Sequence, residues 1–182
     1  MTAAPRTIRP LQLDDISSLQ TIDQEQHGQA WSHRTFCDEI EGTDRLHLVA
    51  ESADDLVGHA SAWIDGTSCR VTNVAVAGEQ AGQGHGSALL LALLHTVLEQ
   101  HRIANVQLEV RPSNRRAQRM YSRFGFMPVG VERNFYDRSD ENGSCDAVVM
   151  AVPDVCAAPW RERLEQLERD LVDSANDAGA AA

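Results

Sequence analysis

The alternation of hydrophobic and polar positions predicts a chain of strands and helices. Apolar residues at every second position, or in short runs bounded by Gly, Asp, Asn or Ser, are typical of strands. The predicted strands cover residues 7–12, 45–52, 56–65, 68–77, 105–110, 126–136 and 145–152. Two helices are expected after the first strand, one after the fourth and one after the fifth. This order predicts an α/β sandwich around a mixed sheet.

Capping residues mark the ends of the predicted helices. The third helix is expected over residues 87–101, and the fourth over residues 114–123. Side chains that accept hydrogen bonds from free N–H groups favour helix starts, and glycine favours helix ends. The predicted starts are Asp14, Ser32 and Asn114, and the predicted ends are Gly42 and Gly125.

The composition changes after residue 152. Residues 158–175 form an amphipathic pattern, and residues 176–182 are expected to be a disordered tail. We therefore divide the chain into a domain of residues 1–153 and a C-terminal segment of residues 154–182. The segment either folds back on the domain or binds a neighbour. Its apolar stripe consists of Trp160, Leu164, Leu167 and Leu171.

The charge balance narrows the class of partner. The chain has 182 residues and a formal net charge of -11, so it lacks the basic surface that nucleic acid requires. No apolar run reaches the roughly 20 residues of a membrane span, and the N-terminus lacks a secretory signal. We expect a cytoplasmic protein, monomeric or weakly dimeric, with no nucleic-acid or membrane partner. The four scattered cysteines favour neither a metal site nor a disulfide framework.

One segment reverses this acidic balance. All 16 basic residues are arginine, and five of them fall within residues 111–123 without any acid. An anionic ligand is therefore expected there. Arg115 and Arg116, at the start of the fourth helix, either attract phosphates or form a solvated charged face.

A glycine-rich turn precedes the leucine-rich third helix. Gly82, Gly84 and Gly86 allow positive φ angles and close backbone approach, and the first N–H groups of a helix favour anions. The turn therefore suits a phosphate or pyrophosphate, although a plain tight turn is the alternative. No Lys-Ser/Thr follows, which excludes a P-loop, and the spacing is not that of a dinucleotide fold.

The turn and its neighbours resemble a known family. "TNVAVAGEQAGQGHGSALL" and "LEVRPSNRRAQRMYSRFGF" resemble the GCN5-related N-acetyltransferase (GNAT) superfamily, although Ala81 stands where the family usually has Gln or Arg. The motifs "WSHRTF", "NVAV", "LEVRPSN", "MYSRFGF", "ERNFY" and "DAVVM" extend the resemblance, over about residues 6–152, to its ribosomal-protein-alanine N-acetyltransferase branch.

The resemblance implies a fold and a co-substrate. The fold is a mixed, mainly antiparallel sheet flanked by helices, here with an extra C-terminal helix. The co-substrate is acetyl-CoA, and no metal is involved. The residues expected to contact acetyl-CoA are Val74, Ala75, Val76, Gln83, Gly84, His85, Gly86, Ser87, Asn114, Arg116 and Tyr121.

Glu109 is the candidate general base. It interrupts an apolar strand, and alternation places it on the face opposite Leu108 and Val110. A solvent-facing strand residue is the alternative reading, but the resemblance assigns the catalytic role. Tyr121 is implied to protonate the CoA thiolate, with packing in the core as the alternative.

Three aromatic residues are expected at the peptide entrance: Trp31, Phe135 and Tyr136. For Trp31 core packing is an equal alternative. Asp137, Asp140 and Glu141 nearby would suit a basic peptide.

The expected reaction is acetylation of a protein N-terminus, first of all a ribosomal protein, by direct attack in a ternary complex. An α-amine is about 10% neutral at pH 7, whereas a lysine is almost fully charged, so a modest base is sufficient. Two alternatives stay open: acetylation of a small amine or a lysine side chain, and an acyl-CoA-binding interaction protein without catalysis.

Overall fold

A seven-stranded sheet with the order β1-β2-β3-β4-β5-β7-β6 forms the centre of the protein. The structure is a computed structural model that describes residues 6–52, 55–137 and 143–180, with residue 6 and the last six of these described by backbone alone. β4 and β5 are parallel, and the other neighbouring pairs are antiparallel, as predicted. The strands are β1 (Arg6–Pro10), β2 (Arg45–Ser52), β3 (Asp55–Asp65), β4 (Ser68–Val76), β5 (Asn105–Val110), β6 (Met127–Glu132) and β7 (Ala147–Val152).

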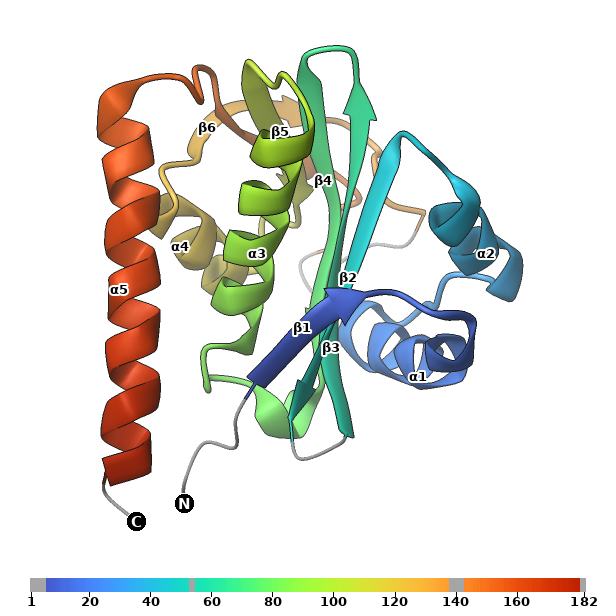
Figure 1. Ribbon diagram of the computed structural model, residues 1–182. Helices are drawn as coiled ribbons and strands as arrows, with labels where there is room; N and C mark the ends of the chain where they lie inside the picture. The colour runs from blue at the N-terminus through green and yellow to red at the C-terminus, as the bar shows by residue number, and fades with distance from the viewer. Residues whose placement is uncertain (1–5, 53–54, 138–142, 181–182) are drawn as a thin grey trace.

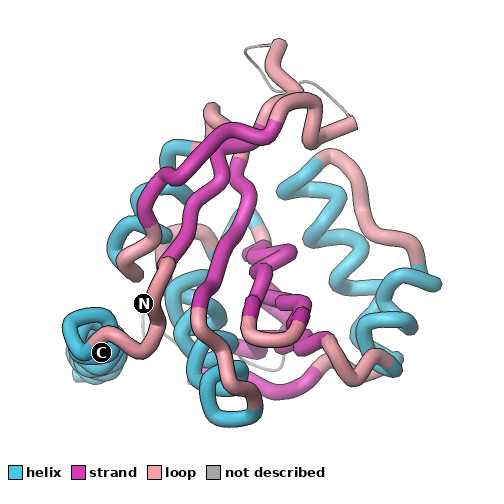
Figure 2. Tube along the Cα trace, turned by 90° about the horizontal axis from the view of Figure 1, so that it is seen from above, coloured by secondary structure: helices cyan, strands magenta, loops and turns pink. Residues whose placement is uncertain are grey.

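Helices cover both faces of the sheet. Figure 1 shows α1 and α2 on one side and α3, α4 and α5 on the other, and Figure 2 shows the same layers from above. Two short 3-10 turns, η1 (Leu13–Asp15) and η2 (Gly78–Gln80), precede α1 and α3. The helices are α1 (Ile16–His27), α2 (His33–Glu41), α3 (His85–Gln100), α4 (Arg115–Arg123) and α5 (Ala158–Ala180).

Two of the three predicted helix caps are confirmed. Ser32 accepts a hydrogen bond from the backbone N of Thr35, and Asn114 accepts one from that of Ala117, both at 3.0 Å. Asp14 was wrong as a cap, because it lies inside η1 and α1 begins at Ile16. The chain enters this helix through a 3-10 turn, a change of geometry that the apolar spacing does not reveal.

The strand predicted over residues 126–136 is shorter in the structure. β6 ends at Glu132, and the backbone then turns, with φ at 55° in Asn134. The N–H of Asn134 donates to Asp146 Oδ1 at 3.0 Å, which stabilises the turn. Phe135 and Tyr136 therefore lie in a loop and not on a strand.

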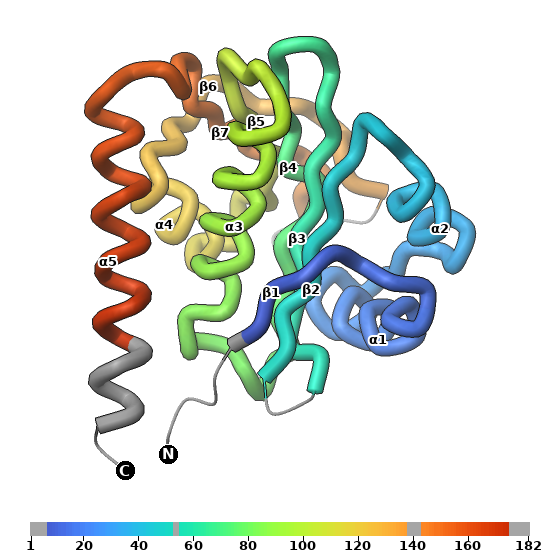
Figure 3. The backbone as a smooth tube through the Cα atoms, in the orientation of Figure 1, coloured from blue at the N-terminus to red at the C-terminus, as the bar shows by residue number. Residues whose placement is uncertain are grey.

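α5 folds back on the domain. Trp160, Leu164 and Leu167 join the main core, and Trp160 Nε1 donates to the carbonyl of Phe124 at 2.8 Å. Figure 3 shows α5 running alongside α3, and these two helices are in contact. The helix continues to Ala180, further than the sequence pattern indicated. Because α5 packs in the same core as the rest of the domain, the structure marks no boundary at residue 153. The division of the chain there stays a prediction.

Two hydrophobic cores lie on opposite faces of the sheet. The larger one joins the sheet to α3, α4 and α5, and includes the leucines of α3. The smaller one lies under α1 and α2 and contains Leu19, Phe36 and Ala75. In the described ranges, no helix is long and apolar enough to cross a membrane.

Candidate active site

The two parallel strands at the centre of the sheet separate along their length. In the described sheet, pairing between β4 and β5 joins residues 68–71 to residues 105–108 and ends there. Residues 73–76 remain paired with β3, and Glu109 and Val110 remain paired with β7. The sheet therefore opens between the two strands beside Glu109 and in front of the glycine-rich turn.

A bulge in β4 determines which side chains face which helices. Thr72 is the extra residue in the register with β3. Val71, before the bulge, and Val74, after it, both pack in the core on the α3 side. Arg70 and Asn73 therefore point to the opposite face, beneath α1 and α2.

The glycine-rich turn has the backbone geometry that its sequence predicts. The φ angles of Gly82 and Gly84 are 93° and 86°, in the region that other residues rarely adopt, and Gly84 caps α3. His85 is the first residue of α3 and is buried, so it is not part of an exposed loop. Arg116 lies next to the turn, since its Nη2 is 3.9 Å from where a Cβ on Gly82 would stand. The N-terminus of α3 thus has a cationic neighbour.

Glu109 is enclosed and ion-paired. Its side chain is only 5% exposed, and Arg70 Nε donates to its Oε2 at 2.8 Å. Glu132 is the second acid near Arg70, at 3.9 Å, and it is half exposed. The alternative of a solvent-facing Glu109 is therefore wrong. The ion pair orients the carboxylate at the point where β4 and β5 separate.

An aromatic pair lies over this ion pair. The rings of Phe135 and Tyr136 meet edge to face at 4.9 Å. The guanidinium of Arg70 is 5.6 Å from the Phe135 ring centre, and that of Arg111 is 3.9 Å from the Tyr136 ring centre. Such cation–π contacts hold the loop after β6 against β4 and β5.

Tyr121 lies in the core but close to the same group. It packs edge to face on Phe126 at 5.9 Å, so the packing alternative is correct as a description of its environment. Burial raises the pKa of Tyr121, and the neighbouring Tyr136 adds to the effect. Burial likewise raises the pKa of Tyr136 to about 12, against the cation of Arg111. Both phenols are therefore hydrogen-bond donors at neutral pH.

Trp31 lies between α1 and α2, apart from this aromatic pair. Its ring packs against Phe36 at 5.7 Å and His47 at 6.1 Å, and it remains partly exposed. The ring contacts agree with the core alternative, and a place for Trp31 at the peptide entrance stays a prediction. Of the three acids expected near the entrance, Asp137 is exposed in the loop after β6, and Asp140 and Glu141 lie outside the described residues.

Two residues of the site, Arg70 and Arg111, were not among the predicted ones. Like Glu109, Arg70 is a charged residue inside an apolar strand. Its partner could not be predicted, because the sequence does not reveal the bulge or the register of β4. Arg111 follows β5 directly, and only the loop carrying Tyr136 gives it a partner.

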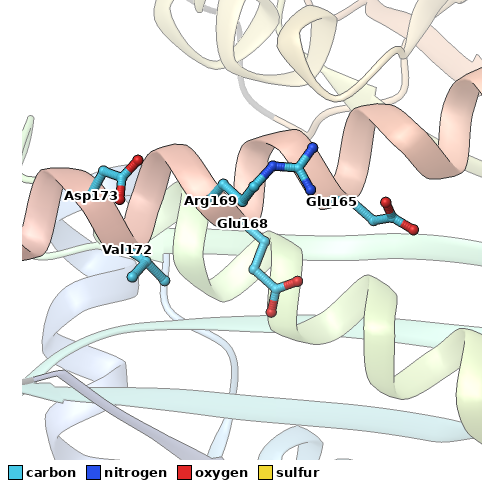
Figure 4. Close-up of a pocket in the computed structure, with 5 residues that line it drawn as sticks. All are labelled: Glu165, Glu168, Arg169, Val172 and Asp173. Atoms are coloured by element: carbon cyan, nitrogen blue, oxygen red, sulfur yellow. The ribbon is translucent and has the colours of Figure 1, made fainter.

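Other hollows of the described surface lie away from Glu109. One is on the outer face of α5, lined by the residues drawn in Figure 4. Another lies between α4 and α5, and its lining is rich in arginine: Arg115, Gln118, Arg119, Ser122, Arg123 and Arg163. Among the described residues, no group of three or more His, Cys, Asp or Glu is placed to hold a metal ion.

The residues present fit a CoA thioester. The turn at Gly82 and Gly84 presents the first amides of α3 beside Arg116, which suits a diphosphate. Met120, Val76 and Val74 are the side chains nearest to where a Cβ on Gly86 would stand, all at ordinary contact distance, so the end of β4 borders the turn and the opening of the sheet begins there. The opening ends at Glu109, where an acyl group would arrive.

The comparisons with known proteins agree with this geometry. The model of the acetyltransferase (GNAT) family matches residues 12–126. A [ribosomal protein bS18]-alanine N-acetyltransferase of Escherichia coli (strain K12) is 32% identical over 147 residues, which cover 81% of this chain and 97% of the relative. An N-alpha-acetyltransferase of Sulfurisphaera tokodaii is 28% identical over 158 residues, which cover 80% and 92% of the two chains.

A solved structure extends the likeness to three dimensions. The crystal structure of the ribosomal-protein-S18-alanine N-acetyltransferase from Escherichia coli matches with a TM-score of 0.74 and 29% identity, covering 85% of this chain and 97% of that chain. The expected fold is therefore confirmed. The chain belongs to the acetyltransferase (GNAT) family and is an acetyl-CoA-dependent N-acetyltransferase.

Proposed function

We propose that this enzyme acetylates the N-terminal α-amine of a protein, with a ribosomal protein as the first candidate. The observation that carries the proposal is the buried Glu109 at the opening between β4 and β5, 5% exposed and oriented by Arg70. The relatives that act on the alanine of ribosomal protein bS18 support it, because they match over 81% of this chain. Such a substrate also places the reaction in the cytoplasm.

The proposed reaction needs only a modest general base. Bound acetyl-CoA supplies the acetyl group as a thioester. Glu109 accepts the amine proton, directly or through water, as the C–N bond forms and the C–S bond breaks. Because an α-amine is about 10% neutral at pH 7, this transfer needs only a positioned carboxylate. Tyr121 keeps its proton because burial raises its pKa, and it donates to the departing sulfur.

The chain's other residues bind and orient the substrates. We assign the diphosphate to the backbone of residues 83–87 and to Arg116, and the pantetheine arm to residues 74–76 and Asn114. We assign the peptide entrance to Trp31 on one side and to Phe135 and Tyr136 on the other.

The test is the substitution Glu109→Gln, assayed with short peptides that carry varied first residues. Loss of a general base lowers kcat by about 10²-fold or more, with little change in the KM for acetyl-CoA. Glu132→Gln is the matched control, because Glu132 is the second acid near Arg70 but is half exposed. We expect its kcat to stay within about twofold of wild type.

Two further outcomes separate the alternatives. Equal rates for peptides with free and blocked N-termini, or higher rates for polyamines, would contradict N-terminal acetylation. Binding of acetyl-CoA without turnover of any amine would indicate an acyl-CoA-binding protein, and Glu109→Gln would then have no effect.

A further inference from the structure

A cluster of buried polar side chains lies under α1 and α2, outside the site described above. We call it the polar cluster. Its members come from five elements, and each is less than 9% exposed, although charged side chains are almost never buried without partners. The polar cluster consists of Asp23, Glu39, His47, His59 and Asn73.

Asp23 is the member with the most partners. Its Oδ1 accepts from His59 Nε2 and from Asn73 Nδ2, both at 3.0 Å. Its Oδ2 faces the backbone N–H of Trp31 at 3.5 Å. One carboxylate thus joins α1 to β3, to β4 and to the segment between α1 and α2. Replacing it leaves several buried donors without an acceptor.

The hydrogen bonds fix the orientation of the two histidines. A carboxylate only accepts, so His59 donates from Nε2 to Asp23, and in its neutral form it accepts at Nδ1. His47 Nε2, 2.9 Å away, is then the donor to His59. Burial alone raises the pKa of Asp23, but the hydrogen bonds from His59 and Asn73 outweigh it, and the net shift is downward. Asp23 is therefore the ionised end of the chain of bonds.

The polar cluster holds Trp31 from two sides. The backbone N–H of Trp31 points to Asp23, and its carbonyl accepts from Gln20 Nε2 at 3.0 Å. The ring lies edge-on to His47, at 6.1 Å, and His47 is fixed by His59. Both the backbone and the ring of this predicted entrance residue therefore depend on the cluster.

The same cluster reaches the strand that borders the opening of the sheet. Asn73 follows the bulge in β4 and shares the α1–α2 face with Arg70 and thus with Glu109. Its amide oxygen is 3.0 Å from Nε2 of His27, at the end of α1. Asp23 and Asn73 therefore connect the segment carrying Trp31 to the strand next to the base.

We propose that Asp23 is a positioning residue for the amine substrate: through Asn73 and the Trp31 backbone it holds the α1–α2 segment against β4. The inference rests on the proposed function, because it takes Trp31 to be part of the peptide entrance. It assigns Asp23 no contact with acetyl-CoA, whose predicted residues lie at the end of β4, in the glycine-rich turn, and on or just before α3 and α4.

The experiment is the substitution Asp23→Asn, which keeps the shape of the side chain. The amide oxygen still accepts from His59 and Asn73, but the NH2 group now meets the Trp31 N–H donor to donor. A buried donor left without an acceptor costs about 1–3 kcal/mol, so the KM for peptide rises roughly 5- to 100-fold. The KM for acetyl-CoA stays within about twofold, and hydrogen exchange at the Trp31 amide becomes faster.

Asp15→Asn is the matched control. Asp15 is also a buried acid beside α1, and it binds Arg9 at 2.7 Å and the N–H of Gln12 at 2.8 Å, not the α1–α2 segment. It reports what the loss of a buried carboxylate does to stability alone. We expect it to lower the melting temperature without raising the KM for peptide relative to that for acetyl-CoA.

Gln20→Ala is the second variant, should Asp23→Asn fail to fold. It removes the other hydrogen bond to the Trp31 backbone from a partly exposed position, so a smaller rise in the peptide KM is expected. Equal changes in both KM values, or unchanged exchange at Trp31, would overturn the proposal. The exchange measurement needs no substrate, so it tests the proposal even if no peptide is acetylated. A failure to acetylate any peptide would contradict the proposed function and not the role of Asp23.

Discussion

Single residues of the site differ in how far the sequence could predict them. Glu109 could be predicted because a glutamate inside an apolar strand needs a partner or a function. The identity of that partner, Arg70, depends on the parallel register of β4 and β5. Asp23 and His59 are far apart in the sequence, and nothing local marks them as a hydrogen-bonded pair. Local patterns therefore indicate functional residues better than they indicate what orients them.

Gly84 offers a test of the phosphate turn at the residue scale. Its φ of 86° makes Gly84→Ala unfavourable by about 1–2 kcal/mol, because an L-residue must be forced into the left-handed region. The turn then relaxes in the free enzyme and must be restored on binding. We expect calorimetry to show acetyl-CoA affinity lower by roughly 5- to 30-fold.

The control for this substitution is Gly66→Ala. Gly66 also has a positive φ, 59°, and an added Cβ there meets nothing within 4 Å. It lies in the turn between β3 and β4, so a similar loss of stability should leave acetyl-CoA affinity unchanged. Equal affinity losses in both variants would show that the effect is global and not due to the turn.

At the scale of whole elements, a pattern of three or more apolar positions predicts that a helix or strand exists, but it does not predict the residue at which the element begins or ends. Every predicted helix and strand exists, because burying an apolar face requires the periodicity that the sequence displays. The errors lie at ends fixed by tertiary contacts. β6 stops at Glu132 because the chain turns towards Asp146, and α1 starts after a 3-10 turn. Neither the turn towards Asp146 nor the 3-10 turn before α1 changes the periodic pattern of apolar residues in the sequence.

α5 is the element whose role can be measured most directly. Leu164 is 3% exposed and packs in the main core, so Leu164→Ala should destabilise the whole protein by about 2–5 kcal/mol. Val172, on the same helix, is 54% exposed, and Val172→Ala should change stability by less than about 0.5 kcal/mol. Chemical denaturation measures both. A separate α5 transition in the wild type would show instead that the helix folds independently.

At the scale of the whole molecule, the two faces of the sheet differ in chemistry. The face under α3, α4 and α5 is apolar, which suits a rigid platform beside the glycine turn. The face under α1 and α2 contains the polar cluster beside a small apolar core. Satisfied hydrogen bonds in a buried network favour one arrangement, as those of Asp23 do here, whereas Glu39 Oε2 and His47 Nδ1 have no hydrogen-bond partner among the described residues. The proposed amine side of the enzyme is thus held by directional bonds, and the proposed CoA side by packing.

The buried His47 of the polar cluster makes the free energy of unfolding dependent on pH. Burial lowers the pKa of His47 from its ordinary value of 6.5, although Glu39 and the carboxylate of Asp23 act in the opposite direction. Between pH 6.5 and the lowered value, the unfolded chain binds a proton that the folded protein does not bind. This contribution to the free energy of unfolding should therefore be fully present above about pH 6.5 and decrease as the pH falls below that value.

Urea denaturation at intervals between pH 5 and 7 measures this dependence. His47→Gln is the informative variant, because the amide can still donate to His59 but does not titrate. Its overall stability is lower, whereas the slope of stability against pH should be smaller than in the wild type. Glu39 Oε2 lies 3.6 Å from His47 Nδ1, and neither atom has a hydrogen-bond partner among the described residues. If the stability of the wild type instead rises as the pH falls, the attraction between Glu39 and protonated His47 outweighs burial and determines the charge of His47.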